Sequence, residues 1–125
     1  MTIGLICAID SELAALSAAL DAGRNTDIAH ARFVEGMLDG HPVVLVGAGM
    51  GKGNAAVVTT LLIERFGART VVFSGVAGGL RPDLAVGDVV IADRVIQCDA
   101  GRIEDGALRV YQPGHVEFFL SLIHI

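Results

Sequence analysis

The residues of this sequence that could do chemistry are one acidic side chain, Glu12, and two glycine-rich turns. The first turn carries glycines at 47, 49, 51 and 53, and the second spans Gly75–Gly79. Each of the three follows an apolar stretch that predicts a buried strand. Glycines after a strand let the backbone approach a ligand closely, and a helix start behind them offers free N–H groups to an oxygen-rich ligand.

Glu12 is expected in the first turn of a helix. Residues 2–9 predict a first buried strand, and Asp10 is a suitable N-cap for a helix that stops at Gly23. This places Glu12 at the carboxyl end of a strand, where the helix dipole favours the ionised carboxylate and where open α/β sheets bind ligands. The alternative is that Asp10 and Glu12 only complement the helix, and position alone favours that alternative.

The first glycine turn resembles two nucleotide-binding motifs and fits neither well. Val46 and Gly53 stand where a Walker A loop has Gly and Ser or Thr, which argues against ATP binding. Residues 51–56 satisfy G-x-G-x-x-A, but no acidic residue ends a strand about 20 residues further on to hold a ribose. Lys52 could contact a ligand or simply be solvated. A dinucleotide site stays an open alternative.

The other elements complete an α/β pattern. We expect a polar connection over 24–30, a hairpin of strands 31–38 and 43–46 around Asp39-Gly40, and a helix from the first glycine turn to about Gly67. Strand 70–74, a turn at 81–83, a long strand over 87–97 and a loop over 99–114 with one short strand at 108–111 follow. Parallel strands would bring Glu12 and both glycine turns to one sheet edge. Together they predict a pocket for a small polar molecule with an apolar part.

The remaining candidates are weaker. The four histidines show no metal-ligand spacing, and Cys7 and Cys98 are too far apart for a disulfide framework or a zinc site. Asp88 and Asp93 are expected to be structural hydrogen-bond partners rather than a catalytic pair. Cys98 could be a buried or a reactive thiol.

Composition favours one soluble cytoplasmic domain. The chain has 125 residues, 53% of them hydrophobic, and a net charge of −5, which argues against a nucleic-acid surface. Charged residues and glycines interrupt each apolar run, so no membrane span is expected, and the start of the chain shows no secretion signal.

Four motifs in this order and spacing carry a family resemblance: IGLICAIDSEL, GAGMGKGNAA, SGVAGGL and VGDVVIAD. They resemble the N-terminal half of the 5′-methylthioadenosine/S-adenosylhomocysteine nucleosidases, members of the nucleoside phosphorylase superfamily, over roughly residues 2–119. The resemblance implies a three-layer α/β/α sandwich with a mixed central sheet, here truncated. It also implies hydrolysis of the N-glycosidic bond of a purine thionucleoside, with release of adenine, without a cofactor or a metal, by a homodimer.

The resemblance assigns roles to individual residues. Glu12 falls on the carboxylate that positions and activates the attacking water. The resemblance therefore favours a catalytic role for Glu12 over the role of only complementing the helix. Such a carboxylate can also stabilise an oxocarbenium-like sugar. Ile9 and Met50 fall where the family lines the alkylthio and ribose end of its pocket. Val76, Ala77 and Gly78 fall on the turn that contacts the nucleoside.

The sequence departs from the family pattern in three ways. Val76 stands where the family often has Ser or Thr, and Cys98 where it has His. Phosphorylases generally place Arg and Ser around the second glycine turn, at the positions of Phe73 and Val76, so water is favoured over phosphate as the nucleophile. A phosphorylase and a non-catalytic nucleoside-binding protein remain alternatives.

The third departure is length. The family domain is nearly twice as long, and its second half carries the general acid and the residues that bind the ribose and the base. We therefore expect residues 1–119 to be the N-terminal part of the domain. We expect residues 120–125, LSLIHI, to be a non-native tail, since a transposon-end sequencing adapter translates to these residues. The chain alone is expected to be inactive and poorly soluble.

Overall fold

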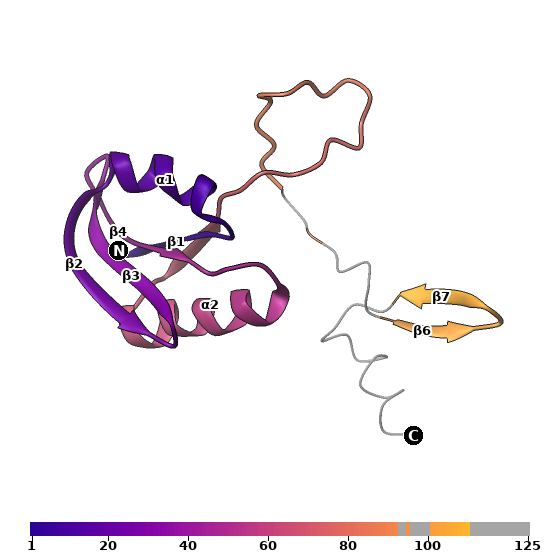
Figure 1. Cartoon of the computed structure of the whole chain (residues 1–125), viewed down its shortest axis with the longest axis horizontal. Coiled ribbons are helices and arrows are strands. Elements are labelled where there is room, and N and C mark those ends of the chain that lie inside the picture. The colour runs from indigo at the N-terminus through magenta and orange to yellow at the C-terminus, as the bar shows by residue number, and fades with distance from the viewer. Residues whose placement is uncertain (93–94, 96–100, 111–125) are drawn as a thin grey trace. The chain divides into compact units, whose positions relative to one another are not determined.

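The computed structural model describes residues 1–92, 95 and 101–110 (Figure 1). The chain divides into two compact units, residues 1–79 and residues 80–125, and each is described by itself. The elements of the first unit, in chain order, are β1 (Ile3–Cys7), α1 (Asp10–Ala19), β2 (Asp21–Ile28), β3 (Ala31–Leu38), β4 (His41–Gly47), α2 (Lys52–Phe66) and β5 (Thr70–Phe73).

The first unit is built on one mixed sheet of five strands in the order β2-β3-β4-β1-β5. The central strand β1 pairs in parallel with β4 on one side and with β5 on the other. Strands β2, β3 and β4 form an antiparallel meander. The parallel half therefore brings the carboxyl ends of β1, β4 and β5 to one edge of the sheet.

The two helices cover opposite faces of this sheet, one above and one below it in Figure 1. Successive side chains of a strand point to opposite faces, so the buried apolar residues of β1 and β4 contribute to two separate cores. The core under α1 is formed by Leu5, Cys7, Leu20, Val43 and Leu45. The core under α2 is formed by Ile6, Phe33, Val44, Val46, Val58, Leu62 and Ala68. The predicted three-layer α/β/α arrangement is confirmed.

The predicted hairpin around Asp39-Gly40 is also confirmed. Its strands β3 and β4 pair from Leu38↔His41 to Phe33↔Val46. Both turn residues have positive φ, 49° at Asp39 and 79° at Gly40, as a two-residue turn of type I′ requires. Helix α2 ends at Gly67 as expected, because Gly67 adopts the left-handed conformation with φ 66°.

The prediction for residues 20–30 was wrong. Helix α1 ends at Ala19 rather than near Gly23, and the expected polar connection is the strand β2. Leu20 still enters the core, but from an extended C-cap residue rather than from a helix. Strand β2 lies at the sheet edge with most of its side chains exposed, so it has no apolar alternation to reveal it. Its pairing with β3 is supported by the ion pairs Arg24–Glu35 and Asp27–Arg32.

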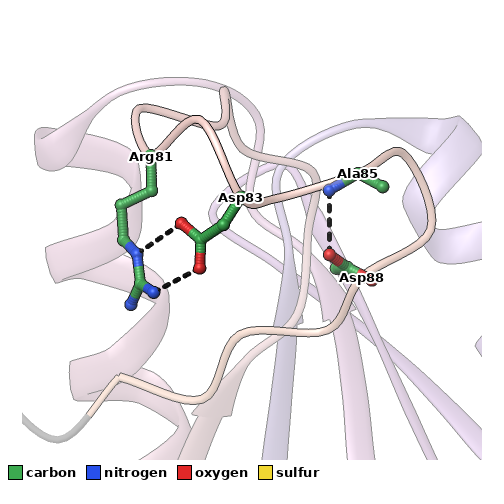
Figure 2. A network of polar contacts seen from close by, with 4 residues as sticks. All are labelled: Arg81, Asp83, Ala85 and Asp88. Atoms are coloured by element: carbon green, nitrogen blue, oxygen red, sulfur yellow. Dashed lines mark hydrogen bonds and ion pairs between the residues drawn. The ribbon is translucent and has the colours of Figure 1, made fainter.

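In the second unit, residues 81–88 form a loop that is held by hydrogen bonds between its own residues (Figure 2). The guanidinium of Arg81 donates two hydrogen bonds to the carboxylate of Asp83, one of them from Nε over 2.9 Å. The Ala85 N–H donates to Oδ2 of Asp88 over 2.8 Å, and the Asp88 N–H donates to the Ala85 carbonyl over 3.2 Å. The expected turn at 81–83 is present, and Asp88 is a structural hydrogen-bond partner, as predicted. Asp93 lies outside the described residues.

The long strand expected over 87–97 is not observed in its described part, since residues 87–92 form neither helix nor strand. A run of β-branched residues becomes a strand only when a neighbouring strand pairs with its backbone groups, and residues 87–92 have no such ladder. Residues 93, 94, 96 and 97 lie outside the described part.

Further along, β6 (Gly101–Glu104) and β7 (Ala107–Val110) form an antiparallel hairpin where one strand was expected, and Tyr111 lies outside the described part. Of the helices that the structure describes, neither is long and apolar enough to cross a membrane.

Candidate active site

Three strand ends meet at one edge of the first unit's sheet. The register pairs Cys7 at the end of β1 with Gly47 at the end of β4, and Ile6 with Phe73 at the end of β5. Pairing continues one residue further on both sides. The Ala48 N–H donates to the Cys7 carbonyl over 2.8 Å, and the Ser74 N–H donates to the Ile6 carbonyl over 2.9 Å. The segments that follow these strands, which carry Glu12 and the two glycine turns, therefore start side by side.

The Glu12 carboxylate lies among three backbone N–H groups. Its Oε2 accepts hydrogen bonds from Ala8 over 2.9 Å and from Ile9 over 3.1 Å. Its Oε1 accepts one from Val76, in the second glycine turn, over 2.9 Å. Asp10 is not the N-cap, contrary to the sequence prediction. Ile9 occupies that position in an extended conformation, and Glu12, the third helical residue, satisfies its N–H in the manner of a capping box.

These hydrogen bonds favour the ionised form of Glu12. The Val76 N–H contributes most to lowering the pKa of the Glu12 carboxyl, followed by Ala8 and, more weakly, Ile9, against partial desolvation that raises it. A carboxylate has about four lone-pair sites, and the three N–H groups occupy two on Oε2 and one on Oε1. One acceptor site therefore remains, on the oxygen that faces the second glycine turn. It can accept a hydrogen from water or from a ligand.

The first glycine turn lies at the same edge of the sheet, and its backbone adopts a conformation that favours glycine. Gly49 and Gly51 have φ of 75° and 106°. Asn54, in the first turn of α2, donates from Nδ2 to the Met50 carbonyl over 2.8 Å and so fixes the turn between them. The Met50 side chain is 77% exposed. Sequence reasoning did not single out Asn54, although Asn side chains commonly hydrogen-bond to backbone groups a few residues away in the chain.

The other predicted site residues lie on segments that leave this edge and are open to solvent. Ile9 is 38% exposed and Val76 is 82% exposed. Ala77 and Gly78 are exposed as well.

The thiol of Cys7 is fully buried in the core under α1. Burial contributes most to raising the pKa of this thiol, followed by the charge of Glu12. Cys98, His115 and His124 lie outside the described residues. Within the described part, no three His, Cys, Asp or Glu side chains gather as a metal site would require.

Comparison with known proteins identifies the family. The family model described as "Phosphorylase superfamily" matches residues 2–121, nearly the whole sequence. The chain belongs to the phosphorylase superfamily. Among curated proteins it is similar to the 5′-methylthioadenosine/S-adenosylhomocysteine nucleosidases of Mycobacterium bovis and Mycobacterium tuberculosis. It is 54% identical to each over 118 residues, 94% of this chain and 46% of the relative. The chain thus spans about half the length of these curated relatives.

Solved structures of superfamily members agree. A nucleosidase of this type from Colwellia psychrerythraea, in complex with adenine, is 45% identical with a TM-score of 0.67, covering 70% of this chain and 36% of that one. An S-adenosylhomocysteine nucleosidase from Streptococcus pyogenes, in complex with 5-methylthiotubericidin, is 30% identical with a TM-score of 0.82, covering 99% of this chain and 55% of that one. The superfamily and the fold that the sequence motifs predicted are both confirmed.

Proposed function

We propose that the whole protein to which this chain belongs hydrolyses the N-glycosidic bond of nucleosides of the 5′-methylthioadenosine and S-adenosylhomocysteine type. The observation that carries the proposal is the Glu12 carboxylate, held by three backbone N–H groups with one acceptor site left on Oε1. It stands at the edge where the two glycine turns meet. The similarity to nucleosidases, at 54% identity over 118 residues, supplies the substrate class.

In this reaction Glu12 would act on water. Its free Oε1 site accepts one hydrogen of a water molecule and aims the oxygen lone pair at the sugar carbon C1′. As the bond from C1′ to the base nitrogen breaks, the negative charge of Glu12 stabilises the oxocarbenium-like sugar. The water oxygen then bonds to C1′, its proton passes to Glu12, and the base leaves as adenine after gaining a proton. The net change consumes one water and forms a free sugar hydroxyl and adenine.

Phosphate is the less suitable nucleophile at this edge. Phe73 and Val76 offer no hydrogen-bond donor from their side chains, and both are largely exposed, at 58% and 82%. An ionised carboxylate beside them would repel a phosphate dianion. A phosphorylase therefore remains the second candidate, supported only by the superfamily. A binding protein without turnover is the third candidate. Glu12→Gln separates it from an enzyme, because a binding protein would keep its affinity whereas an enzyme would lose turnover.

The roles of the other site residues are part of the proposal. Ile9 and Met50 would line the alkylthio and ribose end of the pocket, and their exposed side chains support this. Val76, Ala77 and Gly78 would contact the nucleoside from the second glycine turn. No cofactor or metal is assigned a role. Glu12 supplies the charge and the base, and the general acid would come from outside residues 1–119.

The proposal also covers the setting of the protein. Residues 1–119 would be the N-terminal part of a longer domain, and residues 120–125, which lie outside the described part, a non-native tail. The whole protein would work in the cytoplasm as a homodimer, in methionine salvage, on a small purine thionucleoside rather than on nucleic acid or a membrane. The nucleosidase similarity supports the salvage role, and the net charge of −5 supports a small-molecule partner over nucleic acid.

A hybrid chain tests the proposed function. This hybrid joins residues 1–119 of this chain to the part of the Mycobacterium tuberculosis relative that follows the matched region. We expect the hybrid to release adenine from methylthioadenosine in phosphate-free buffer, with no gain when phosphate is added. A rate that depends on phosphate would make the protein a phosphorylase instead. The 125-residue chain alone is the control, and we expect no adenine release from it.

A further inference from the structure

We propose that Gly75 is a positioning residue for Glu12: the absence of a side chain at position 75 lets the carboxylate reach the Val76 N–H and keeps the free site of Oε1 in place. The inference rests on the proposed function for its catalytic consequence. Its structural part concerns only where the Glu12 carboxylate lies, and can be measured without catalysis.

The geometry at Gly75 leaves no room for a methyl group. A Cβ built on Gly75 would lie 2.8 Å from Oε1, 3.0 Å from Cδ and 3.1 Å from Oε2 of Glu12. Carbon–oxygen contacts of this length are repulsive, so something must move. Gly78, in the same turn, has nothing within 4 Å of its own Cβ position. At position 75, it is therefore the Glu12 carboxylate that leaves no space for a side chain.

The backbone at Gly75 cannot easily retreat from the clash. The Ser74 N–H is hydrogen-bonded to the Ile6 carbonyl over 2.9 Å, which extends the β1–β5 ladder up to the turn. Gly75 itself has no positive φ, so an alanine there would not meet the backbone strain of the left-handed region. The carboxylate, in contrast, is the end of a flexible side chain and can rotate away. An added methyl group would therefore displace Glu12 and leave the fold intact.

This displacement would change the chemistry of Glu12. The Val76 N–H is the largest of the influences that lower the pKa of the Glu12 carboxyl, and the bond is lost when Oε1 moves. The free acceptor site of Oε1 moves with it. Misplacing a catalytic group by about 1 Å can cost about 10²-fold in rate. The position before Val76 therefore affects both the pKa and the orientation of the Glu12 carboxyl.

The test compares Gly75→Ala with Gly53→Ala in the hybrid labelled with ¹³C at the glutamate carboxyl. The Glu12 signal is identified by its absence in Glu12→Gln. Gly53 also has open space at its Cβ position and lies in α2, so Gly53→Ala controls for the added methyl group. We expect the titration midpoint of Glu12 to rise in Gly75→Ala towards that of a free glutamate, about 4.3, and to stay unchanged in Gly53→Ala. An unchanged midpoint in Gly75→Ala would overturn the inference.

Two further readouts separate a positioning role from a structural one. The urea midpoint of unfolding should fall in Gly75→Ala by no more than it does in Glu12→Gln, since both lose the stability of the hydrogen-bonded carboxylate, whereas kcat/KM for adenine release should fall by about 10²-fold. Added to Glu12→Gln, Gly75→Ala should cost no further activity, because the group it positions is already gone. If the hybrid shows no turnover while the Glu12 midpoint still rises, the proposed function fails and the inference stands. If the hybrid shows turnover and the titration midpoint of Glu12 does not move in Gly75→Ala, the inference fails and the proposed function stands.

Discussion

The backbone N–H of Val76 donates a hydrogen bond to Oε1 of Glu12 over 2.9 Å, although the two residues are 64 positions apart in the chain. The contact is made possible by the parallel pairing of β1 with β5, which brings the start of α1 beside the second glycine turn. It joins the two segments to which sequence motifs assign the chemistry. It also uses the backbone of residue 76, so it does not depend on the Ser or Thr side chain that the family often has there.

The ionised state of Glu12 should be visible in the pH dependence of stability. The pKa of Glu12 is lowered in the folded protein, so its carboxylate contributes stability at a pH above its unfolded pKa of about 4.3. That contribution is lost as the pH falls through the lower folded pKa. We expect the difference in urea midpoint between the hybrid and its Glu12→Gln variant to be largest near neutral pH and to shrink below about pH 4.3. A difference that stays constant from neutral pH to acid would contradict the assignment.

Gly36 should be intolerant of a side chain for a structural reason. It pairs with Ala22 beside the irregularity in the β2–β3 ladder, and a Cβ there would lie 2.5 Å from the Asp21 carbonyl oxygen and 3.1 Å from the Ala22 Cα. Backbone atoms cannot swing aside as the Glu12 carboxylate can. We expect Gly36→Ala to destabilise the hybrid by about 1–3 kcal/mol in urea unfolding. Gly53→Ala should be neutral or stabilising by up to about 1 kcal/mol, and equal stability of the two variants would refute the contact.

Cys7 should be an inert thiol in the native protein. It is fully buried in the core under α1, and burial raises the pKa of its thiol, with a smaller contribution from Glu12. The thiolate is the reactive form, and here it is both disfavoured and inaccessible. We expect iodoacetamide to label Cys7 only after unfolding in urea, as measured by mass spectrometry of the peptide that carries it. Labelling of the native hybrid at the unfolded rate would place Cys7 at the surface.

The buried half of the fold was predictable because its sequence signals are strong. Residues 43–46 form an apolar run that ends at Gly47, and Asp39-Gly40 is a typical hairpin turn. Residues 70–74 were expected to form a buried strand. They do form the strand β5, but the prediction of burial was wrong, because β5 lies at the edge of the sheet and three of its four residues are exposed. Strand β2 was missed because an edge strand with exposed charges owes its conformation to its partner β3 rather than to its own pattern. Residues 87–92 show the converse. Their β-branched pattern predicts a strand, but a pattern does not supply the pairing that a strand needs.

The site was predictable in its location but not in its contacts. Parallel pairing of apolar strands was sufficient to place Glu12 with both glycine turns, because strand direction decides where their ends lie. The three N–H groups around Glu12 could not be foreseen, since backbone donors have no signature in side-chain types. Gly75 could be noticed as the first glycine after β5, yet its closeness to Glu12 depends on the β1–β5 register.

The role of Glu12 in activating water is best measured by adenine release by the hybrid and by its Glu12→Gln variant, together with the affinity of each for adenine. Gln keeps the size of the side chain but cannot take a proton from water. We expect turnover to fall by about 10²–10⁴-fold while the Kd for adenine changes little. Turnover that survives the substitution would show that Glu12 does not activate water. Binding of adenine by the unsubstituted hybrid without any turnover would make the protein a nucleoside-binding protein instead.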